Sequence, residues 1–213
     1  LTMRLAGLCK IPTPEHGLIP LRDGTPAFIV RRFDRPSQGG KRRQEDFCQL
    51  SERPPKDKYR GSAELCGKLT RRFASEPGIA MRDLYRRQLF AWWTGNGDMH
   101  LKNFSLAEDE EGRFGLAPAY DQVCTRLVIA DDDLALPIDG RRKNLRPSSF
   151  KNLARAYELP ARAAARAAGG LCDCLEPALT LVHRAPLPQS MRTVYAEILC
   201  SRASLLAELA ARD

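Results

Sequence analysis

The sequence predicts an α+β fold in which short strands come early and helices follow. Three observations support this fold class. Two short apolar runs flank Asp23-Gly24, a dipeptide whose backbone suits a tight hairpin turn. Residues 148–209 show apolar side chains at helical spacing throughout. Finally, 213 residues that are 43% apolar and 28% charged are enough to bury one sizeable globular core.

The first sixty residues are expected to contain one helix and one hairpin. Leucines at positions 1, 5 and 8 have helical spacing, and the prolines at positions 12 and 14 end that helix. The runs 18–21 and 27–30 are expected to pair as strands around the Asp23-Gly24 turn. Residues 34–60 are rich in proline, glycine and charge, which predicts a loop with one helical turn at 44–50.

A helix and a second hairpin are predicted in the middle of the chain. Residues 81–93 place four large side chains on one helical face, which is more typical of a core than of a ligand cage: Tyr85, Leu89, Trp92 and Trp93. Glycines at positions 95 and 97 then end the helix. The runs 104–107 and 113–117 are expected to pair as strands around an acidic turn.

The C-terminal third is predicted to be helical. Helices are expected at 150–157 and at 171–182, followed by a long helix that begins at the cap Ser190 and carries an apolar stripe to residue 209. The strands therefore gather in the first half of the chain, and a mostly helical lobe follows.

Cysteine usage and charge restrict the compartment and the partners. Seven scattered cysteines, an odd number, indicate reduced and buried thiols and a cytoplasmic location. The net charge of +8 is concentrated in residues 31–60, with ten Lys/Arg against five Asp/Glu, and in residues 141–170, with eight against one. Such stretches attract phosphate-bearing partners, although a solvated basic face is the alternative. No apolar run reaches the ~18 residues of a membrane span, and the N-terminus lacks a secretory pattern, so no membrane partner is expected.

One glycine-punctuated loop concentrates chemically active side chains, namely Asp98, His100, Lys102 and Asn103. Phosphate transfer from ATP uses a carboxylate that receives the substrate hydroxyl proton, an amide oxygen on Mg²⁺ five residues later, and a second carboxylate beyond a hairpin. Asp98, Asn103 and Asp121 have this order and spacing. A metal hydrolase that uses Asp98, His100 and Asp121 is the competing interpretation, and a single histidine makes it the poorer fit.

These residues resemble the HipA-like toxin kinases, bacterial serine/threonine kinases of toxin–antitoxin systems whose fold is related to that of protein kinases. The resemblance runs from residue 1 to about residue 159. It depends on the loop around Asp98, together with the segments Arg32-Phe-Asp-Arg35, Gln44-Glu-Asp-Phe-Cys48 and Leu116-Ala-Pro-Ala-Tyr-Asp121.

The resemblance implies a role for each residue of the loop. Asp98 would be the catalytic base. Asn103 and Asp121 would hold Mg²⁺, and His100 and Lys102 would contact ATP. The expected cofactors are therefore ATP and Mg²⁺.

The resemblance also implies a lobe organisation. Arg31, Arg32 and Phe33 would form the hinge strand that meets adenine, where relatives commonly have an acidic residue at the position of Arg31. Residues 1–50 would be a remnant of the N-terminal lobe and hinge, and residues 51–213 the helical C-terminal lobe with the catalytic loop. A Gly-rich loop, an autophosphorylated serine and a strand lysine would precede residue 1. We expect these upstream in the same chain, on a separate N-terminal-lobe polypeptide, or lost.

The resulting prediction is a kinase toxin that transfers the ATP γ-phosphate to a serine of a host protein, with an aminoacyl-tRNA synthetase suggested by analogy. The expected partners are a helix-turn-helix antitoxin, DNA only indirectly, and a tRNA-associated protein substrate. The alternative is a catalytically incomplete kinase-fold module that holds the antitoxin or DNA. A small-molecule phosphotransferase is a third interpretation.

Overall fold

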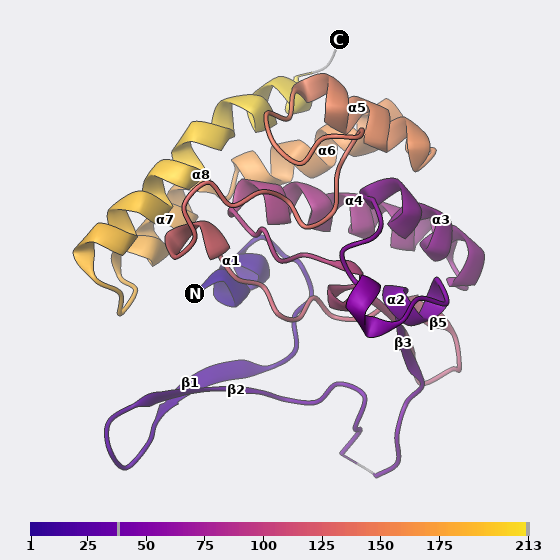
Figure 1. The fold of residues 1–213 in the computed structure, drawn as a ribbon, viewed down its shortest axis with the longest axis horizontal. Helices are drawn as coiled ribbons and strands as arrows, with labels where there is room; N and C mark the ends of the chain where they lie inside the picture. The colour runs from indigo at the N-terminus through magenta and orange to yellow at the C-terminus, as the bar shows by residue number, and fades with distance from the viewer. Residues whose placement is uncertain (38, 212–213) are drawn as a thin grey trace.

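The computed structural model describes residues 1–37 and 39–211, whose helices lie in layers above a small sheet and a protruding hairpin (Figure 1). The helices are α1 (Thr2–Leu8), α2 (Phe47–Leu50), α3 (Ala63–Phe73), α4 (Pro77–Trp93), α5 (Pro147–Ala156), α6 (Ala161–Cys172), α7 (Leu175–His183) and α8 (Gln189–Ala210). The strands are β1 (His16–Pro20), β2 (Pro26–Val30), β3 (Gln44–Asp46), β4 (Ser105–Glu108) and β5 (Phe114–Leu116). This arrangement agrees with the predicted α+β class.

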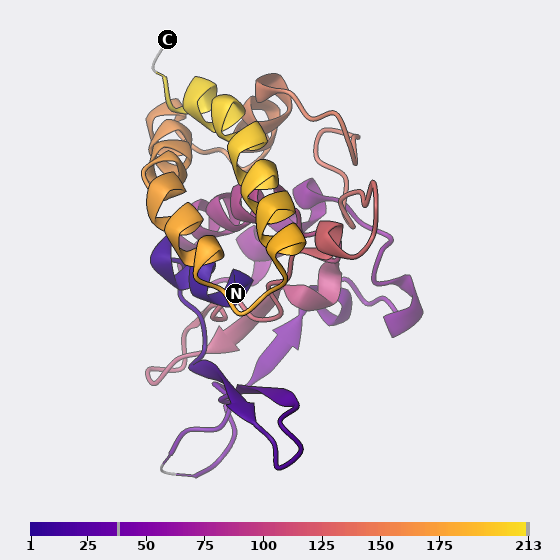
Figure 2. The same ribbon diagram turned by 90° about the vertical axis from the view of Figure 1, so that its left-hand side faces the viewer.

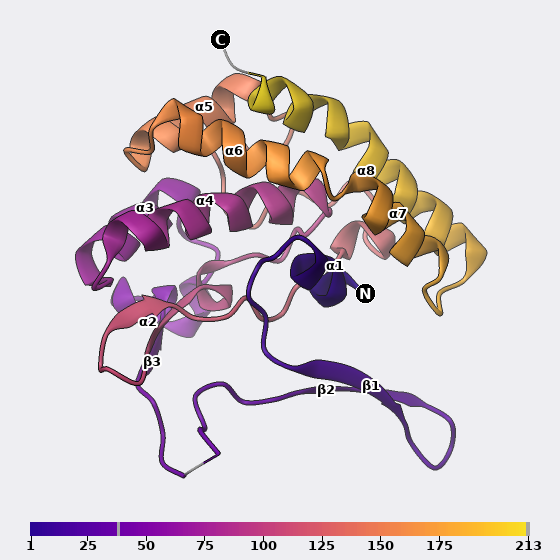
Figure 3. The ribbon, with the colours of Figure 1, turned by 180° about the vertical axis from the view of Figure 1, so that it is seen from behind.

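Helix α4 forms the centre of the core. The four side chains that the sequence placed on one face are buried, with Trp92 9% exposed and Trp93 completely enclosed. Trp93 Nε1 donates a hydrogen bond to the carbonyl of Leu199 on α8 at 3.1 Å. Helices α6 and α8 lie side by side and cover α4 from the side opposite the strands (Figures 2 and 3). No helix within residues 1–37 and 39–211 combines the length and apolar character needed to cross a membrane.

The strands β3, β4 and β5 form an antiparallel sheet in that order. The predicted helical turn at 44–50 was therefore half wrong, because residues 44–46 pair with β4 in the register Asp46↔Ser105. Helix α2 starts only at Phe47, where Asp46 accepts a hydrogen bond from the backbone N–H of Gln49 at 2.8 Å and closes a capping box. A partner strand sixty residues away leaves no trace in the local sequence, so this strand was missed.

The helices also differ from prediction at several points. Helix α3 was missed, and α4 begins one turn earlier than expected, at Pro77. The helix predicted over 171–182 is correct from Leu175 on, as α7, but its start is wrong: α6, which was not predicted, ends at Cys172 and a turn follows. Both helices pack along α8, which explains why apolar spacing continues through the break. Ser190 lies inside α8 rather than at its cap, since the helix follows Pro188.

All seven cysteines are free thiols. Four are buried and Cys172 and Cys174 are half-buried, but Cys200 is exposed on α8, so the expectation of buried thiols was wrong for Cys200.

The hairpin of β1 and β2 projects from the helices (Figures 1 and 2). Its strands pair from His16↔Val30 to Pro20↔Pro26, as the Asp23-Gly24 turn predicted. Six large apolar side chains in and beside it are 41–56% exposed, namely Leu18, Ile19, Leu21, Phe28, Ile29 and Val30. A two-stranded hairpin is marginal in water unless something packs against it. This apolar surface is therefore available to a partner.

Candidate active site

The loop after α4 is shaped by backbone geometry. Gly95 has φ +74°, a left-handed conformation that glycine adopts without strain, and the N–H of Asn96 bonds back to the last turn of α4 at 2.9 Å. The side-chain oxygen of Asn96 then accepts a hydrogen bond from the N–H of Asp98 at 3.0 Å. Gly97 N–H donates to Thr125 Oγ1 at 2.7 Å. These hydrogen bonds fix the backbone between the end of α4 and Asp98.

Buried side chains anchor the segment that follows Asp98. Met99 and Leu101 are inserted into the core, with 4% and 0% exposure. The backbone N–H of Leu101 donates to the carbonyl of Lys58 at 3.1 Å. Residues Leu101–Asn103 form one 3-10 turn that ends at the start of β4. The loop is therefore fastened on both sides of Asp98.

Asp98 and Asn103 are joined directly. Asn103 Nδ2 donates to the backbone carbonyl of Asp98 at 2.8 Å, and Asn103 is 7% exposed. Because the amide nitrogen is used in this bond, Oδ1 is the atom left for a cation. The Asp98 carboxylate is 41% exposed, and its Oδ1 accepts a hydrogen bond from the Tyr59 hydroxyl at 2.6 Å.

His100 lies beneath the carboxylate. Its Nε2 is 3.9 Å from Asp98 Oδ1, and its ring meets the ring of Tyr59 edge-on, with centroids 5.1 Å apart. Burial lowers the pKa of His100 below its usual value, while the charges of Asp98 and Asp121 act in the opposite direction. Because the net effect lowers its pKa, this imidazole is neutral at neutral pH and serves as a hydrogen-bonding group rather than a cation.

Lys102 reaches away from the carboxylate. Its Nζ is 3.4 Å from Asp46 Oδ2, and its side chain is 39% exposed. Ion pairs this exposed contribute at most about 1 kcal/mol. The ammonium can therefore exchange Asp46 for a phosphate at little cost.

Asp121 returns to the same region after the β4–β5 hairpin. Tyr120, the preceding residue, donates its hydroxyl to the carbonyl of Lys102 at 2.9 Å and also bonds with the Ser105 hydroxyl. Asp121 itself is exposed and has φ +55°. Asp131 and Asp139 share this left-handed backbone, which aspartate adopts more readily than most residues.

The predicted hinge segment, residues 31–33, contacts the residue before Asp121 through one aromatic pair. Phe33 stacks on Tyr120, with ring centroids 5.8 Å apart and planes 26° apart. A cavity of about 280 Å³ opens beside this pair, and Arg31 and Arg32 belong to its lining. Arg32 forms two hydrogen bonds to buried Asp34, at 2.7 and 2.6 Å, which lower the pKa of that carboxyl. Arg31 is exposed and instead pairs with Glu15 of the segment before β1 at 2.9 Å.

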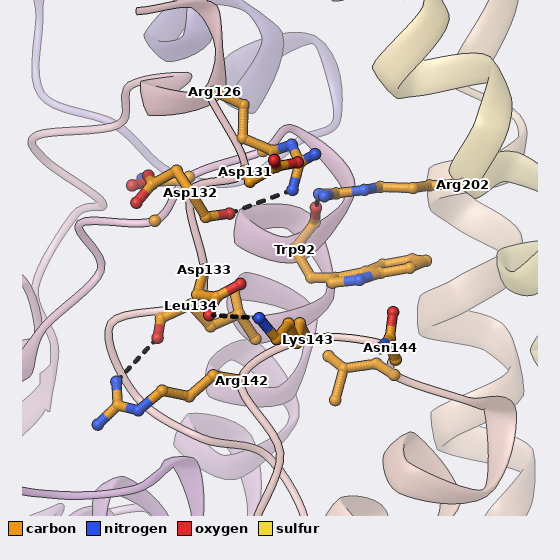
Figure 4. Close-up of a pocket in the computed structure, with 14 residues that line it drawn as sticks. Trp92, Arg126, Asp131, Asp132, Asp133, Leu134, Arg142, Lys143, Asn144 and Arg202 are labelled. Atoms are coloured by element: carbon orange, nitrogen blue, oxygen red, sulfur yellow. Dashed lines mark hydrogen bonds and ion pairs between the residues drawn. The ribbon is translucent and has the colours of Figure 1, made fainter. Parts of the chain in front are cut away.

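A second cavity of about 400 Å³ borders the glycines of the loop (Figure 4). The segment after Asp121 forms one wall, where Arg126 donates to the carbonyl of Asp132 at 3.1 Å and Lys143 lies 3.8 Å from Asp133. Arg142 donates to the carbonyl of Leu134 at 2.9 Å. Part of the basic stretch at 141–143 is thus used to hold its own loop.

The sequence reasoning missed Tyr59. It lies in the stretch expected to be a loop, and no motif there marks it. Only the fold brings its hydroxyl to Asp98, so no sequence signal could have found the contact.

The oxygen donors in this loop fit Mg²⁺. Asn103 Oδ1 and the Asp121 carboxylate are hard ligands of the kind that Mg²⁺ prefers, and Mg²⁺ commonly takes its other ligands from phosphates and water. Within the described ranges no three His, Cys, Asp or Glu side chains gather into a metal-binding group. A two-donor site completed by a nucleotide therefore suits these residues better than an all-protein metal site.

The model of the HipA-like C-terminal domain family matches residues 1–179. The chain is 32% identical over 164 residues to a Sinorhizobium fredii protein named "Putative kinase Y4dM", and 30% identical over 158 residues to a Haemophilus influenzae protein named "Putative kinase". These matches cover 71% and 67% of this chain but 39% and 46% of the relatives. The chain thus spans less than half the length of these relatives.

Two solved structures share the fold. HipA of Shewanella oneidensis, in complex with HipB and operator DNA, superposes with a TM-score of 0.79 at 22% identity, over 100% of this chain and 57% of that one. The Helicobacter pylori proinflammatory kinase CtkA gives a TM-score of 0.70 at 12% identity, over 98% of this chain and 82% of that one. The predicted kinase-like α+β fold is confirmed.

Proposed function

Because the chain belongs to the HipA-like C-terminal domain family, we propose that it is the catalytic lobe of a serine/threonine protein kinase that transfers the γ-phosphate of ATP to a serine. The observation that carries the proposal is the hydrogen bond from Asn103 Nδ2 to the carbonyl of Asp98. It holds the candidate base and a candidate Mg²⁺ ligand in one rigid loop, and Asp121 returns to the same loop through the bond from Tyr120 to Lys102.

The proposed chemistry assigns one task to each side chain. The carboxylate of Asp98 accepts the proton of the substrate hydroxyl as the oxygen attacks phosphorus. Asn103 and Asp121 would hold Mg²⁺, which supplies charge neutralisation on the transferring phosphate when it is bound. Lys102 exchanges Asp46 for a phosphate oxygen, and neutral His100 offers a ring N–H.

The adenine would lie in the cavity beside Phe33 and Tyr120. Their stacked rings offer an apolar face to a flat base, and Arg32 is held at the rim by Asp34. Arg31 is turned toward Glu15, so its contact with nucleotide requires that this exposed ion pair opens.

The partners follow by analogy. HipA of Shewanella oneidensis is found with HipB and operator DNA, which supports a toxin–antitoxin role, a helix-turn-helix antitoxin and an indirect link to DNA. The net charge of +8 suits a host target that binds tRNA, such as an aminoacyl-tRNA synthetase. The cytoplasmic location is proposed on the seven free thiols.

The lobe division at residue 50 also remains a proposal. The exposed apolar hairpin of β1 and β2 supports it, because that surface suits a lobe or a separate polypeptide carrying the Gly-rich loop and lysine. The same hairpin favours the alternative function, a kinase-fold module that binds an antitoxin without catalysis.

Transfer of labelled γ-phosphate separates these two functions. The complete protein, or its complex with the chain that carries the upper lobe, is incubated with Mg·ATP and a panel of aminoacyl-tRNA synthetases. We expect label on a serine of one substrate. A folded, antitoxin-binding protein that neither transfers phosphate nor hydrolyses ATP would establish the binding module instead.

Asp121→Ala is expected to weaken nucleotide binding in the presence of Mg²⁺ much more than in EDTA. Asp121 is exposed and its backbone is in the left-handed region. The proposed partner of its carboxylate is the metal rather than the nucleotide itself. Calorimetric titration of ATP with and without Mg²⁺ measures the difference. Equal affinities for wild type and variant in Mg²⁺ would remove Asp121 from the metal site.

Arg141→Ala with Lys143→Ala is expected to reduce the salt dependence of binding to a tRNA-associated target. Both side chains are exposed, and the contact of Lys143 with Asp133 is a long surface ion pair of 3.8 Å. Arg142 is left unchanged because it donates a hydrogen bond to the carbonyl of Leu134. Each lost phosphate contact should lower the slope of log K against log salt by roughly 0.7–0.9. Fluorescence titrations across a salt series measure that slope, and an unchanged slope would identify this stretch as a solvated basic face.

A further inference from the structure

The hydroxyl of Tyr59 already occupies the position that a phosphate acceptor needs. It donates to Asp98 Oδ1 at 2.6 Å, which is the contact a candidate base makes with the proton it abstracts. This hydrogen bond, with smaller contributions from burial and from the charge of Asp98, raises the pKa of Tyr59 to about 12. The phenol is therefore protonated at neutral pH and needs a base to become a nucleophile.

The ring is held from several sides rather than by this one bond. The His100 ring meets it edge-on at 5.1 Å, and Lys58 Nζ lies 4.9 Å from its centroid. Its backbone is fixed as well, because the neighbouring carbonyl of Lys58 accepts from the N–H of Leu101 in the catalytic loop. The hydroxyl is thus positioned by the same loop that carries Asp98.

Tyr59 is also the most solvent-exposed of the five tyrosines. It is 43% exposed, whereas Tyr85, Tyr157 and Tyr195 are at most 1% exposed. The fifth, Tyr120, is half-buried, and its hydroxyl is engaged by Ser105 and the carbonyl of Lys102. A phosphotyrosine signal from this chain can therefore be assigned to one residue.

We propose that Tyr59 is a phosphate acceptor that the chain modifies in cis, with Asp98 of the same molecule as the base. This assignment rests on the proposed kinase function. The O–H proton passes to the Asp98 carboxylate, the phenolic oxygen forms a bond to the γ-phosphorus of ATP, and the bond from that phosphorus to the β,γ-bridging oxygen breaks. ADP leaves with the electron pair of the broken bond, and the proton on Asp98 returns to solvent.

Phosphorylated Tyr59 would change the charge and the access of the candidate active site. A phosphate on Tyr59 places about two negative charges beside Asp98, where like charges repel and the carboxylate is shielded from another hydroxyl. One cation lies beside the ring that would carry this phosphate, because Lys58 Nζ is 4.9 Å from the ring centroid of Tyr59. Modification is therefore expected to slow transfer to other substrates.

The test follows phosphotyrosine and ATP hydrolysis in parallel on the complete protein or its complex with the upper lobe. Wild type, Tyr59→Phe and Asp98→Asn are incubated with Mg·ATP, and peptides are mapped by mass spectrometry. We expect phosphate on Tyr59 in wild type, at a rate independent of protein concentration, and no phosphotyrosine in Tyr59→Phe. Tagged Asp98→Asn mixed with untagged wild type should stay unmodified, because the base acts on its own chain.

Three results would be decisive against parts of this scheme. ATP hydrolysis without phosphate on Tyr59 overturns the assignment while leaving the kinase function intact. Phosphate on Tyr59 of the tagged Asp98→Asn chain overturns transfer in cis. Neither hydrolysis nor phosphate transfer in a folded protein overturns the proposed kinase function, and the Tyr59 assignment with it.

Discussion

Asp98→Asn is expected to lower the rate of phosphate transfer by about 10²- to 10⁴-fold, the contribution typical of a general base. The amide is nearly the same size as the carboxylate but cannot take a proton at neutral pH. The loop should keep its shape, because Asn103 Nδ2 bonds to the backbone carbonyl of Asp98 rather than to its side chain. Turnover of γ-labelled ATP onto a serine substrate measures the loss, and thermal unfolding verifies the fold.

Asp131→Asn is the matched control for this experiment. It makes the same substitution at an exposed aspartate outside the catalytic loop, and its φ of +53° is a conformation that asparagine tolerates well. We expect near wild-type turnover from this control. If Asp98→Asn keeps more than about a tenth of wild-type turnover, a modest loss for a general base, another group accepts the proton.

Residues 1–213 alone are expected to bind Mg·ATP at least roughly 10-fold more weakly than the form that includes the upper lobe. Kinases hold the phosphates from two sides, and on the proposed assignment the residues described above supply only the side that holds the metal. One charge-assisted hydrogen bond contributes about 1.5–3 kcal/mol, so losing a strand lysine alone accounts for roughly 10- to 100-fold in affinity.

Calorimetric titration of Mg·ATP into the two forms measures the difference. The Asp121→Ala variant of the longer form is the control, because it should lose the Mg²⁺-dependent part of binding while keeping the upper clamp. Equal, micromolar binding by both forms would show that the nucleotide site lies elsewhere on these residues. Binding by neither form would favour the non-catalytic module.

Local sequence patterns were sufficient wherever a structure depends on neighbouring residues. The Asp23-Gly24 turn predicted the first hairpin, and the apolar face containing Trp92 and Trp93 predicted the central helix. The step from Asp98 to Asn103, followed by the hairpin and Asp121, is likewise a local pattern, and the roles it assigns to these residues stay a prediction. In the fold, Asn103 bonds to Asp98 and Tyr120 bonds to Lys102. Turns and amphipathic helices depend on backbone dihedral preferences and on the periodicity of apolar residues. Both can be recognised in a short stretch of sequence.

Long-range contacts needed the tertiary structure. Strand β3 forms because residues 44–46 pair with β4. The break between α6 and α7 is not marked in the apolar spacing, which continues because both helices pack along α8. Lys102 bonds to Asp46, and Tyr59 bonds to Asp98, across 56 and 39 residues of chain. The sequence by itself named the candidate side chains for holding Mg²⁺ and for moving a proton. Only the fold decided that the hydroxyl of Tyr59 lies on Asp98, the candidate base. That contact depends on packing between two segments that are distant in the sequence, and neither segment's local sequence indicates the other.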